Sequence, residues 1–111
     1  MYEYRIESVE VIDGDTVRAM VDFGREIFAR DVYRLAGVNA PERNTPEGIA
    51  AKQFAQEWID SNSRHGPLLI RTIKDRREKY GRYLANIVSD VTDKSLTLDL
   101  LAAGHAKEYR P

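Results

Sequence analysis

Apolar and polar residues alternate in three stretches near the start of the chain, two later apolar stretches are bounded by turn residues, and one stretch between them has the spacing of a helix. Alternation with a period of two residues is typical of strands with one buried face. In the first stretch the apolar positions change parity near Glu7 and Ser8, which indicates a bulge or a sharp bend. Asp31 interrupts the apolar parity of the third stretch. The predicted strands are 2–11, 16–23, 27–35, 68–73 and 83–89.

A helix is predicted between the third and fourth strands. Thr45 can cap its first turn, and Pro46 suits the first helical position. A stripe at helical spacing predicts the face that packs on the core, and its members are Ala51, Phe54, Ala55, Trp58 and Ile59. We expect this helix to end before His65. After the fifth strand, Thr97 is expected to cap a short helix that ends at Gly104.

The predicted order is therefore three strands, a helix, two strands and a short helix. Five short strands with a bent first strand fit a Greek-key barrel of the oligonucleotide-binding (OB) type. We expect an α+β fold in which residues 1–111 form one domain, because a chain of this length buries one modest core.

Composition restricts the classes of function. The chain has no cysteine, which excludes disulfides and thiol catalysis. It has no long apolar run, so we expect no membrane span and no membrane partner. No leader precedes the first predicted strand, which favours a cytoplasmic location. We expect a monomer.

The formal net charge is −1, whereas proteins that coat nucleic acid usually carry a basic excess. Contact with a polyanion must therefore come from a local patch. Six Lys and Arg residues lie within 71–82, against Asp75 and Glu78. The alternative interpretation of this run is a solvated, charged loop.

Three short segments carry candidate chemistry. The first, 13–16, reads Asp-Gly-Asp-Thr and lies between two predicted strands. It is a turn by composition, and it can hold the Asp15 carboxylate rigidly at a strand end. It is no EF-hand, because that loop needs further oxygen donors and a terminal Glu. Calcium takes several oxygen ligands from acids and carbonyls, so Asp15 is a candidate for one of them.

The second segment follows the third predicted strand and contains Arg34, Asn39 and Glu42. The third segment, 79–82, contains Lys79, Tyr80 and Arg82. Arginine pairs with two phosphate oxygens and stays charged, so two arginines and a cation could neutralise a phosphodiester under attack. By composition alone, the two segments could equally be a polar loop and a surface turn.

In this order, the three segments resemble the staphylococcal-nuclease-like (thermonuclease) domain, a calcium-dependent, sugar-nonspecific nuclease on an OB barrel. The resemblance runs from about Val9 to Lys107. It implies that Asp15 is a calcium ligand and that Ala40 contributes its backbone carbonyl. It places Asn39 where the family has a second acidic ligand, so we expect weak binding of calcium.

The resemblance also implies catalytic roles for Glu42, Arg34 and Arg82. Glu42 would orient or deprotonate the attacking water, while the two arginines would bind the phosphate. Lys79 and Tyr80 would contact a neighbouring phosphate of single-stranded or locally melted DNA or RNA. The products would carry 3′-phosphate and 5′-hydroxyl ends. The alternative is a nuclease-like domain that binds nucleic acid or another partner without cutting, and a third interpretation is a plain barrel whose motifs are structural turns.

Overall fold

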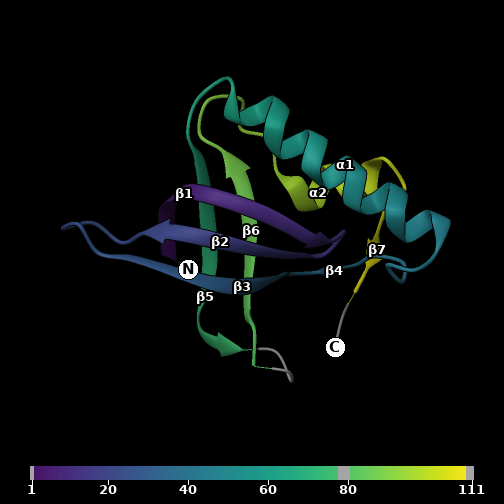
Figure 1. Cartoon of the computed structure of the whole chain (residues 1–111), viewed down its shortest axis with the longest axis horizontal. Helices are drawn as coiled ribbons and strands as arrows, with labels where there is room; N and C mark the ends of the chain where they lie inside the picture. The colour runs from purple at the N-terminus through teal and green to yellow at the C-terminus, as the bar shows by residue number, and fades with distance from the viewer. Residues whose placement is uncertain (1, 78–80, 110–111) are drawn as a thin grey trace.

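Five strands close into a barrel in the computed structural model, which describes residues 2–77 and 81–109 (Figure 1). Around the barrel the strands run in the order β1-β2-β3-β6-β5, and β5 returns to pair with β1. All neighbouring pairs are antiparallel except β3 and β6, which are parallel. This closed, five-stranded architecture with two helices confirms the predicted fold class. The elements are β1 (Tyr2–Asp13), β2 (Thr16–Asp22), β3 (Phe28–Leu35), β4 (Val38–Asn39), α1 (Pro46–Ser63), β5 (Leu68–Arg77), β6 (Tyr83–Ser89), α2 (Leu96–Ala102) and β7 (Lys107–Glu108).

The long first strand bends where its apolar pattern predicted. Its pairing with β2 shifts register between Ile6 and Ser8, and again between Val11 and Asp13. A bulge of this kind increases the local twist of a strand, which allows one strand to pair with two neighbours around a small barrel. β1 accordingly pairs with β5 through its first four residues and with β2 along most of its length.

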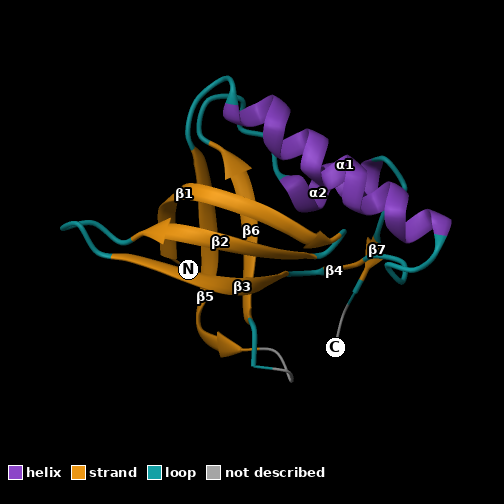
Figure 2. Cartoon of the chain, viewed as in Figure 1, coloured by secondary structure: helices purple, strands orange, loops and turns teal. Residues whose placement is uncertain are grey.

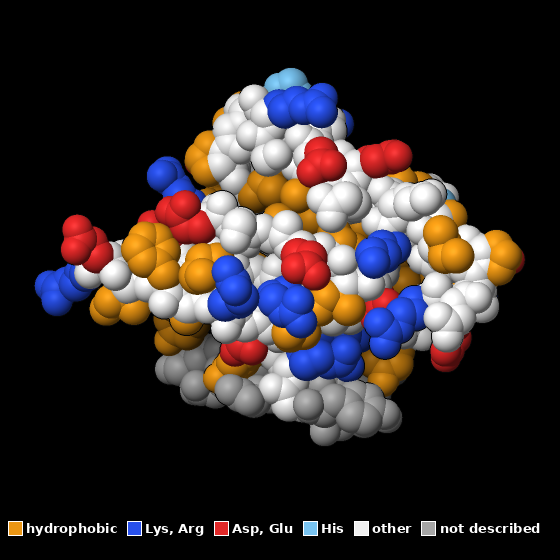
Figure 3. Space-filling model, viewed as in Figure 1, with side chains coloured by type: hydrophobic (Ala, Val, Ile, Leu, Met, Phe, Trp, Pro, Cys, Tyr) orange, Lys and Arg blue, Asp and Glu red, His pale blue; other side chains and the backbone are white. Residues whose placement is uncertain are grey.

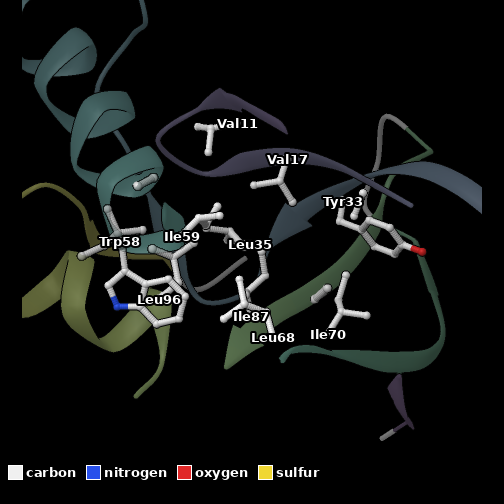
Figure 4. Packing of buried hydrophobic residues seen from close by; sticks show 14 of the residues in the cluster. Val11, Val17, Tyr33, Leu35, Trp58, Ile59, Leu68, Ile70, Ile87 and Leu96 are labelled. Atoms are coloured by element: carbon white, nitrogen blue, oxygen red, sulfur yellow. The ribbon is translucent and has the colours of Figure 1, made fainter. Parts of the chain in front are cut away.

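Both helices lie on the same side of the barrel (Figure 2). Thr45 caps α1, because its side-chain oxygen accepts the N–H of Gly48 at 3.0 Å. Trp58 and Ile59 of α1 pack with Val17 and Leu35 of the barrel in one buried cluster (Figure 4). The indole of Trp58 also donates a hydrogen bond of 2.7 Å to Asp99 of α2. Helix α1 is therefore fixed to the end of the barrel that carries the β1–β2 turn.

Three details differ from the sequence prediction. Ser95, and not Thr97, caps α2, and its side chain accepts the N–H of Leu98. Ser and Thr are both good capping residues, but only Ser95 precedes the first residue of the helix. The hydroxyls of Ser95 and Thr97 bond each other at 3.0 Å. β5 continues to Arg77, beyond the predicted end of that strand. The short pair β4–β7 was not predicted, because strands of two residues have no measurable periodicity.

Tyr33 provides a pH-dependent test of this packing. It faces the barrel interior and is 4% exposed. Burial, assisted by the negative charge of Asp31, raises the pKa of its hydroxyl from 10.0 to about 12. Between these two pH values the unfolded chain releases the proton while the folded chain keeps it, so the free energy of unfolding should fall as pH rises from 10 to about 12.

Tyr33→Phe should remove this contribution, and the free energy of unfolding of the variant should then fall less steeply over the same pH range. Urea unfolding at a series of alkaline pH values measures the difference, with Tyr2→Phe as an exposed control. Equal slopes for Tyr33→Phe and the parent protein would show that this hydroxyl ionises as easily in the folded as in the unfolded chain.

None of the helices in the described residues is long and apolar enough to cross a membrane.

Candidate functional site

The turn between β1 and β2 packs closely against two other segments. Gly14 is buried in this turn, and a Cβ at its position would lie 2.7 Å from the Cβ of Ala51 and 2.9 Å from that of Ala40. Both distances are shorter than ordinary carbon contacts. Glycine is therefore needed here for the close approach of the turn to α1 and to the loop before it. This approach positions the next residue, Asp15, against β4.

The carboxylate of Asp15 is held by hydrogen bonds on both oxygens. Oδ1 accepts the Thr16 hydroxyl at 3.0 Å, and Oδ2 accepts the backbone N–H of Ala40 at 2.8 Å. The backbone oxygen of Asp15 accepts the N–H of Leu35 at 2.8 Å. The Asp15 side chain is only 13% exposed. These contacts fix one negative charge at the junction of β2, β3 and β4.

The guanidinium of Arg34 lies beside that carboxylate. Its Nη2 is 3.4 Å from Asp15 Oδ2 and donates to Asn39 Oδ1 at 3.1 Å. Its Nη1 donates to the backbone oxygen of Leu35 at 2.8 Å. The side chain is 12% exposed, so its position is well defined by these partners. Arginine has five N–H donors, and its Nε–H has no acceptor in the described part of the chain.

Glu42 lies in the loop between β4 and α1, two residues after Ala40. Its backbone oxygen accepts both the hydroxyl of Thr45 at 2.6 Å and the N–H of Thr45 at 3.1 Å. A Cβ on Gly48 would lie 1.9 Å from that oxygen, so α1 begins directly against this peptide group. The Glu42 residue is exposed, and its carboxylate has no hydrogen-bond or ion-pair partner within the described residues. A fixed backbone thus presents a carboxylate that is open to solvent.

Arg82 reaches the same region from the start of β6, the strand that pairs with β3. β6 runs parallel to β3 with Tyr83 opposite Tyr33, and Arg82 immediately precedes β6. Its Nη1 lies 3.5 Å from the Thr16 hydroxyl, which is itself bonded to Asp15. Two of the three predicted segments and Arg82 of the third therefore meet. Lys79 and Tyr80 lie outside the described residues.

Tyr109 is a contact of the site that sequence reasoning did not assign. The pairing of β4 with β7 carries the chain end back across the site, and the Tyr109 N–H donates to the Gly37 oxygen at 2.9 Å. The centroid of its ring is 5.8 Å from the Arg34 guanidinium carbon. At this distance the face of an aromatic ring attracts a cation. No periodic signal could have placed Tyr109 here, because β7 has two residues.

The donors around Asp15 suit a hard cation but carry little charge. Asp15 and Asn39 contribute side-chain oxygens, and Asp15 Oδ1, which accepts only the Thr16 hydroxyl, keeps a free lone pair. Calcium takes 6–8 such oxygens. The backbone carbonyl of Ala40, the residue after Asn39, is a further candidate ligand. However, no group of three or more acidic, His or Cys side chains in the described residues could hold a metal ion. The oxygen set therefore fits calcium chemically, with one carboxylate where tighter sites have several.

A model of the family described as "Staphylococcal nuclease homologue" matches residues 32–111. This is most of the chain, and the matched part includes Arg34, Asn39, Glu42 and Arg82. The chain belongs to the staphylococcal nuclease family. No curated protein matches the chain.

Membership in the staphylococcal nuclease family confirms the resemblance drawn from the three segments. The family is generally one of nucleases, it typically depends on calcium, and membership suggests binding of nucleic acid. Asp15 lies outside the matched residues, and the packing of Gly14 against Ala51 and Ala40 is what joins it to them.

Proposed function

We propose that the protein is a calcium-dependent, sugar-nonspecific nuclease that hydrolyses DNA and RNA to 3′-phosphate and 5′-hydroxyl ends. The proposal depends mainly on one observation. The Arg34 guanidinium is held between Asp15 and Asn39, at 3.4 and 3.1 Å, while Arg82 lies against Thr16 of the same cluster. Two guanidinium groups next to one fixed carboxylate suit a phosphodiester better than a neutral ligand.

In this proposal Arg34 and Arg82 both bind the scissile phosphate. Arg34 binds the non-bridging oxygens of the scissile phosphate with its free N–H groups, and the charge building on these oxygens strengthens the contact. Arg82 also neutralises the 5′ oxygen as it leaves. The Arg34 fork is already oriented by Leu35 and Asn39, so little reorganisation is needed when the phosphate arrives.

Glu42 would orient the attacking water and accept its proton as the oxygen attacks phosphorus. Its carboxylate is exposed and free of protein partners in the described residues, as a base that must reach a substrate-bound water requires. The rigid attachment of its backbone to Thr45 limits the positions that the carboxylate can take.

Calcium would be held by Asp15, Asn39 and the carbonyl of Ala40, and when bound it would supply positive charge to the phosphate. We expect weak binding for two reasons. Asn39 is neutral, and affinity for calcium depends strongly on the number of charged ligands. The Arg34 guanidinium lies within 3.4 Å of both side-chain oxygens and would repel a second cation.

The neutral Asn39 also favours a second candidate function, which is binding of nucleic acid without cutting. A test must therefore measure binding and cutting on the same sample. The purified protein is incubated with labelled single-stranded DNA in calcium and in chelator, beside Arg82→Ala. Cutting that requires calcium and is lost in Arg82→Ala supports the nuclease, whereas binding without cutting in abundant calcium supports the second candidate.

Asn39→Asp should lower the calcium concentration needed for half-maximal binding about tenfold, because it restores one ligand charge. Arg34 would pair with part of the new charge, which keeps the gain from being larger. Calorimetric titration with calcium measures the change independently of activity. Asn44→Asp adds the same charge at an exposed position of the same loop and should leave the affinity nearly unchanged. Equal effects of the two variants would mean that Asn39 is no ligand.

A further inference from the structure

A groove lies beside the candidate site, along the flank of α1. Its volume is about 440 Å³, within the range of small-ligand pockets. Four of its lining residues are spaced at i, i+3, i+4 and i+7 along α1, next to the stripe that packs on the barrel. The groove is lined by Ile12, Arg43, Ile49, Lys52, Gln53 and Gln56.

The chemistry of this lining is specific. It contains two cations, two amides and two isoleucines, and it contains no carboxylate. Ile49 is 51% exposed, which is a large apolar surface to leave beside a Lys. Cations recognise phosphate, amides can bond the edges of bases, and an apolar surface can contact a base face. A nucleotide presents all three of these groups.

Two of the lining residues contact carboxylates, Arg43 with Asp13 and Gln56 with Asp60. Asp13 Oδ1 is 3.9 Å from the Nε of Arg43, and this oxygen has no hydrogen bond. The Arg43 side chain is nevertheless 68% exposed, so most of its guanidinium remains available. Asp60 accepts a hydrogen bond of 3.1 Å from the Gln56 amide and orients it.

The groove is continuous with the candidate site along the chain. Arg43 follows Glu42 directly, and Ile12 immediately precedes the turn that carries Asp15. Figure 3 shows several Lys and Arg side chains on this face, below α1 and over the neighbouring strands, with a few acidic side chains among them. A strand that passes the two arginines of the site could therefore place its next nucleotide in the groove.

We propose that this groove binds a nucleotide that flanks the scissile bond on the same single strand. This inference depends on the proposed nuclease function. Arg43 and Lys52 contact the phosphate next to the one that is cut, and Ile49 contacts the base. The groove thus makes the protein prefer longer strands to dinucleotides, without a part in the bond-breaking step.

The test uses fluorescence anisotropy with a labelled oligothymidylate of about twelve nucleotides, in the Glu42→Gln background so that the strand stays whole. The double variant Arg43→Gln with Lys52→Gln should lose affinity about tenfold at low salt. The slope of log affinity against log salt should become less steep by about 0.7 for each phosphate contact that is lost. Ile49→Ser should lose affinity about threefold with an unchanged slope, because it removes no charge.

The matched control is Arg64→Gln with Lys94→Gln, which removes the same charge from exposed positions outside the groove. If the two double variants lose affinity equally, only the overall charge matters and the groove proposal is wrong. If the groove variants bind like the background protein, the proposal is also wrong.

A second assay separates failure of this proposal from failure of the proposed function. With Glu42 present, the groove variants should cut a thymidine dinucleotide as fast as the parent protein while cutting the longer strand more slowly. If the parent protein cuts both substrates and the groove variants cut both at the same rates as the parent, only the groove proposal is overturned. A parent protein that neither binds nor cuts either substrate overturns both.

Discussion

Glu42→Gln should lower kcat about 100- to 10,000-fold, which is the usual contribution of a positioned general base. The substitution keeps the size and the hydrogen-bonding oxygen of the side chain but removes its ability to accept a proton. Because Glu42 is exposed and its side chain has no partner in the described residues, the variant should fold normally. Its KM should change little, since the phosphate is bound by the two arginines.

Steady-state cleavage of a fluorogenic oligonucleotide in saturating calcium measures this effect. Glu47→Gln is the matched control, since Glu47 is an exposed acid in the first turn of α1, five residues further along the chain. It should retain nearly full activity. A kcat for Glu42→Gln within about twofold of the parent value would remove Glu42 from the mechanism.

Arg34→Lys should lower kcat/KM about 100- to 1,000-fold, although it keeps the positive charge. The guanidinium makes bonds to Leu35 and Asn39 that need its two terminal nitrogens, and a lysine ammonium cannot reproduce this fork. The variant should also lose the orientation that Tyr109 gives to the flat face of Arg34, which lies 5.8 Å from the ring. Most of the loss in kcat/KM should therefore come from poorer positioning of the phosphate, since the positive charge is kept.

Arg30→Lys is the matched control, because Arg30 lies on the same strand with the same parity and is exposed. The two variants have equal charge, so long-range attraction of the polyanion is the same in both. If Arg34→Lys and Arg30→Lys have equal kcat/KM values, the charge of Arg34 matters and its geometry does not. Thermal unfolding of both variants detects any loss of folding at the partly buried Arg34 position.

Much of the site could be predicted from the sequence because its chemistry is concentrated in short segments. Asp15 is placed by a two-residue turn, and Arg34 and Asn39 are five residues apart around one strand end. These positions at strand ends follow from strand and turn signals, whereas the resemblance to the nuclease family implied that the segments meet. The barrel was predictable for the same reason, since its first three strands alternate and the bend near Ser8 appears as a change of parity.

The remaining contacts depend on pairs of residues that are distant in sequence. Gly14 suggested only a turn, whereas its absent side chain is required by Ala51, which is 37 positions away. Tyr109 reaches Arg34 through a pairing of two-residue strands that leaves no pattern. The groove likewise needs the flank of α1 to lie against Ile12, and nothing in the spacing of the helix says which strand end it meets.

The most direct test of the account is to identify the ends of the products after a single turnover on single-stranded DNA, with protein in excess and calcium present. The account predicts fragments that end in 3′-phosphate and begin with 5′-hydroxyl, formed in calcium and absent in chelator. An intact strand that stays bound to the protein in saturating calcium would contradict it.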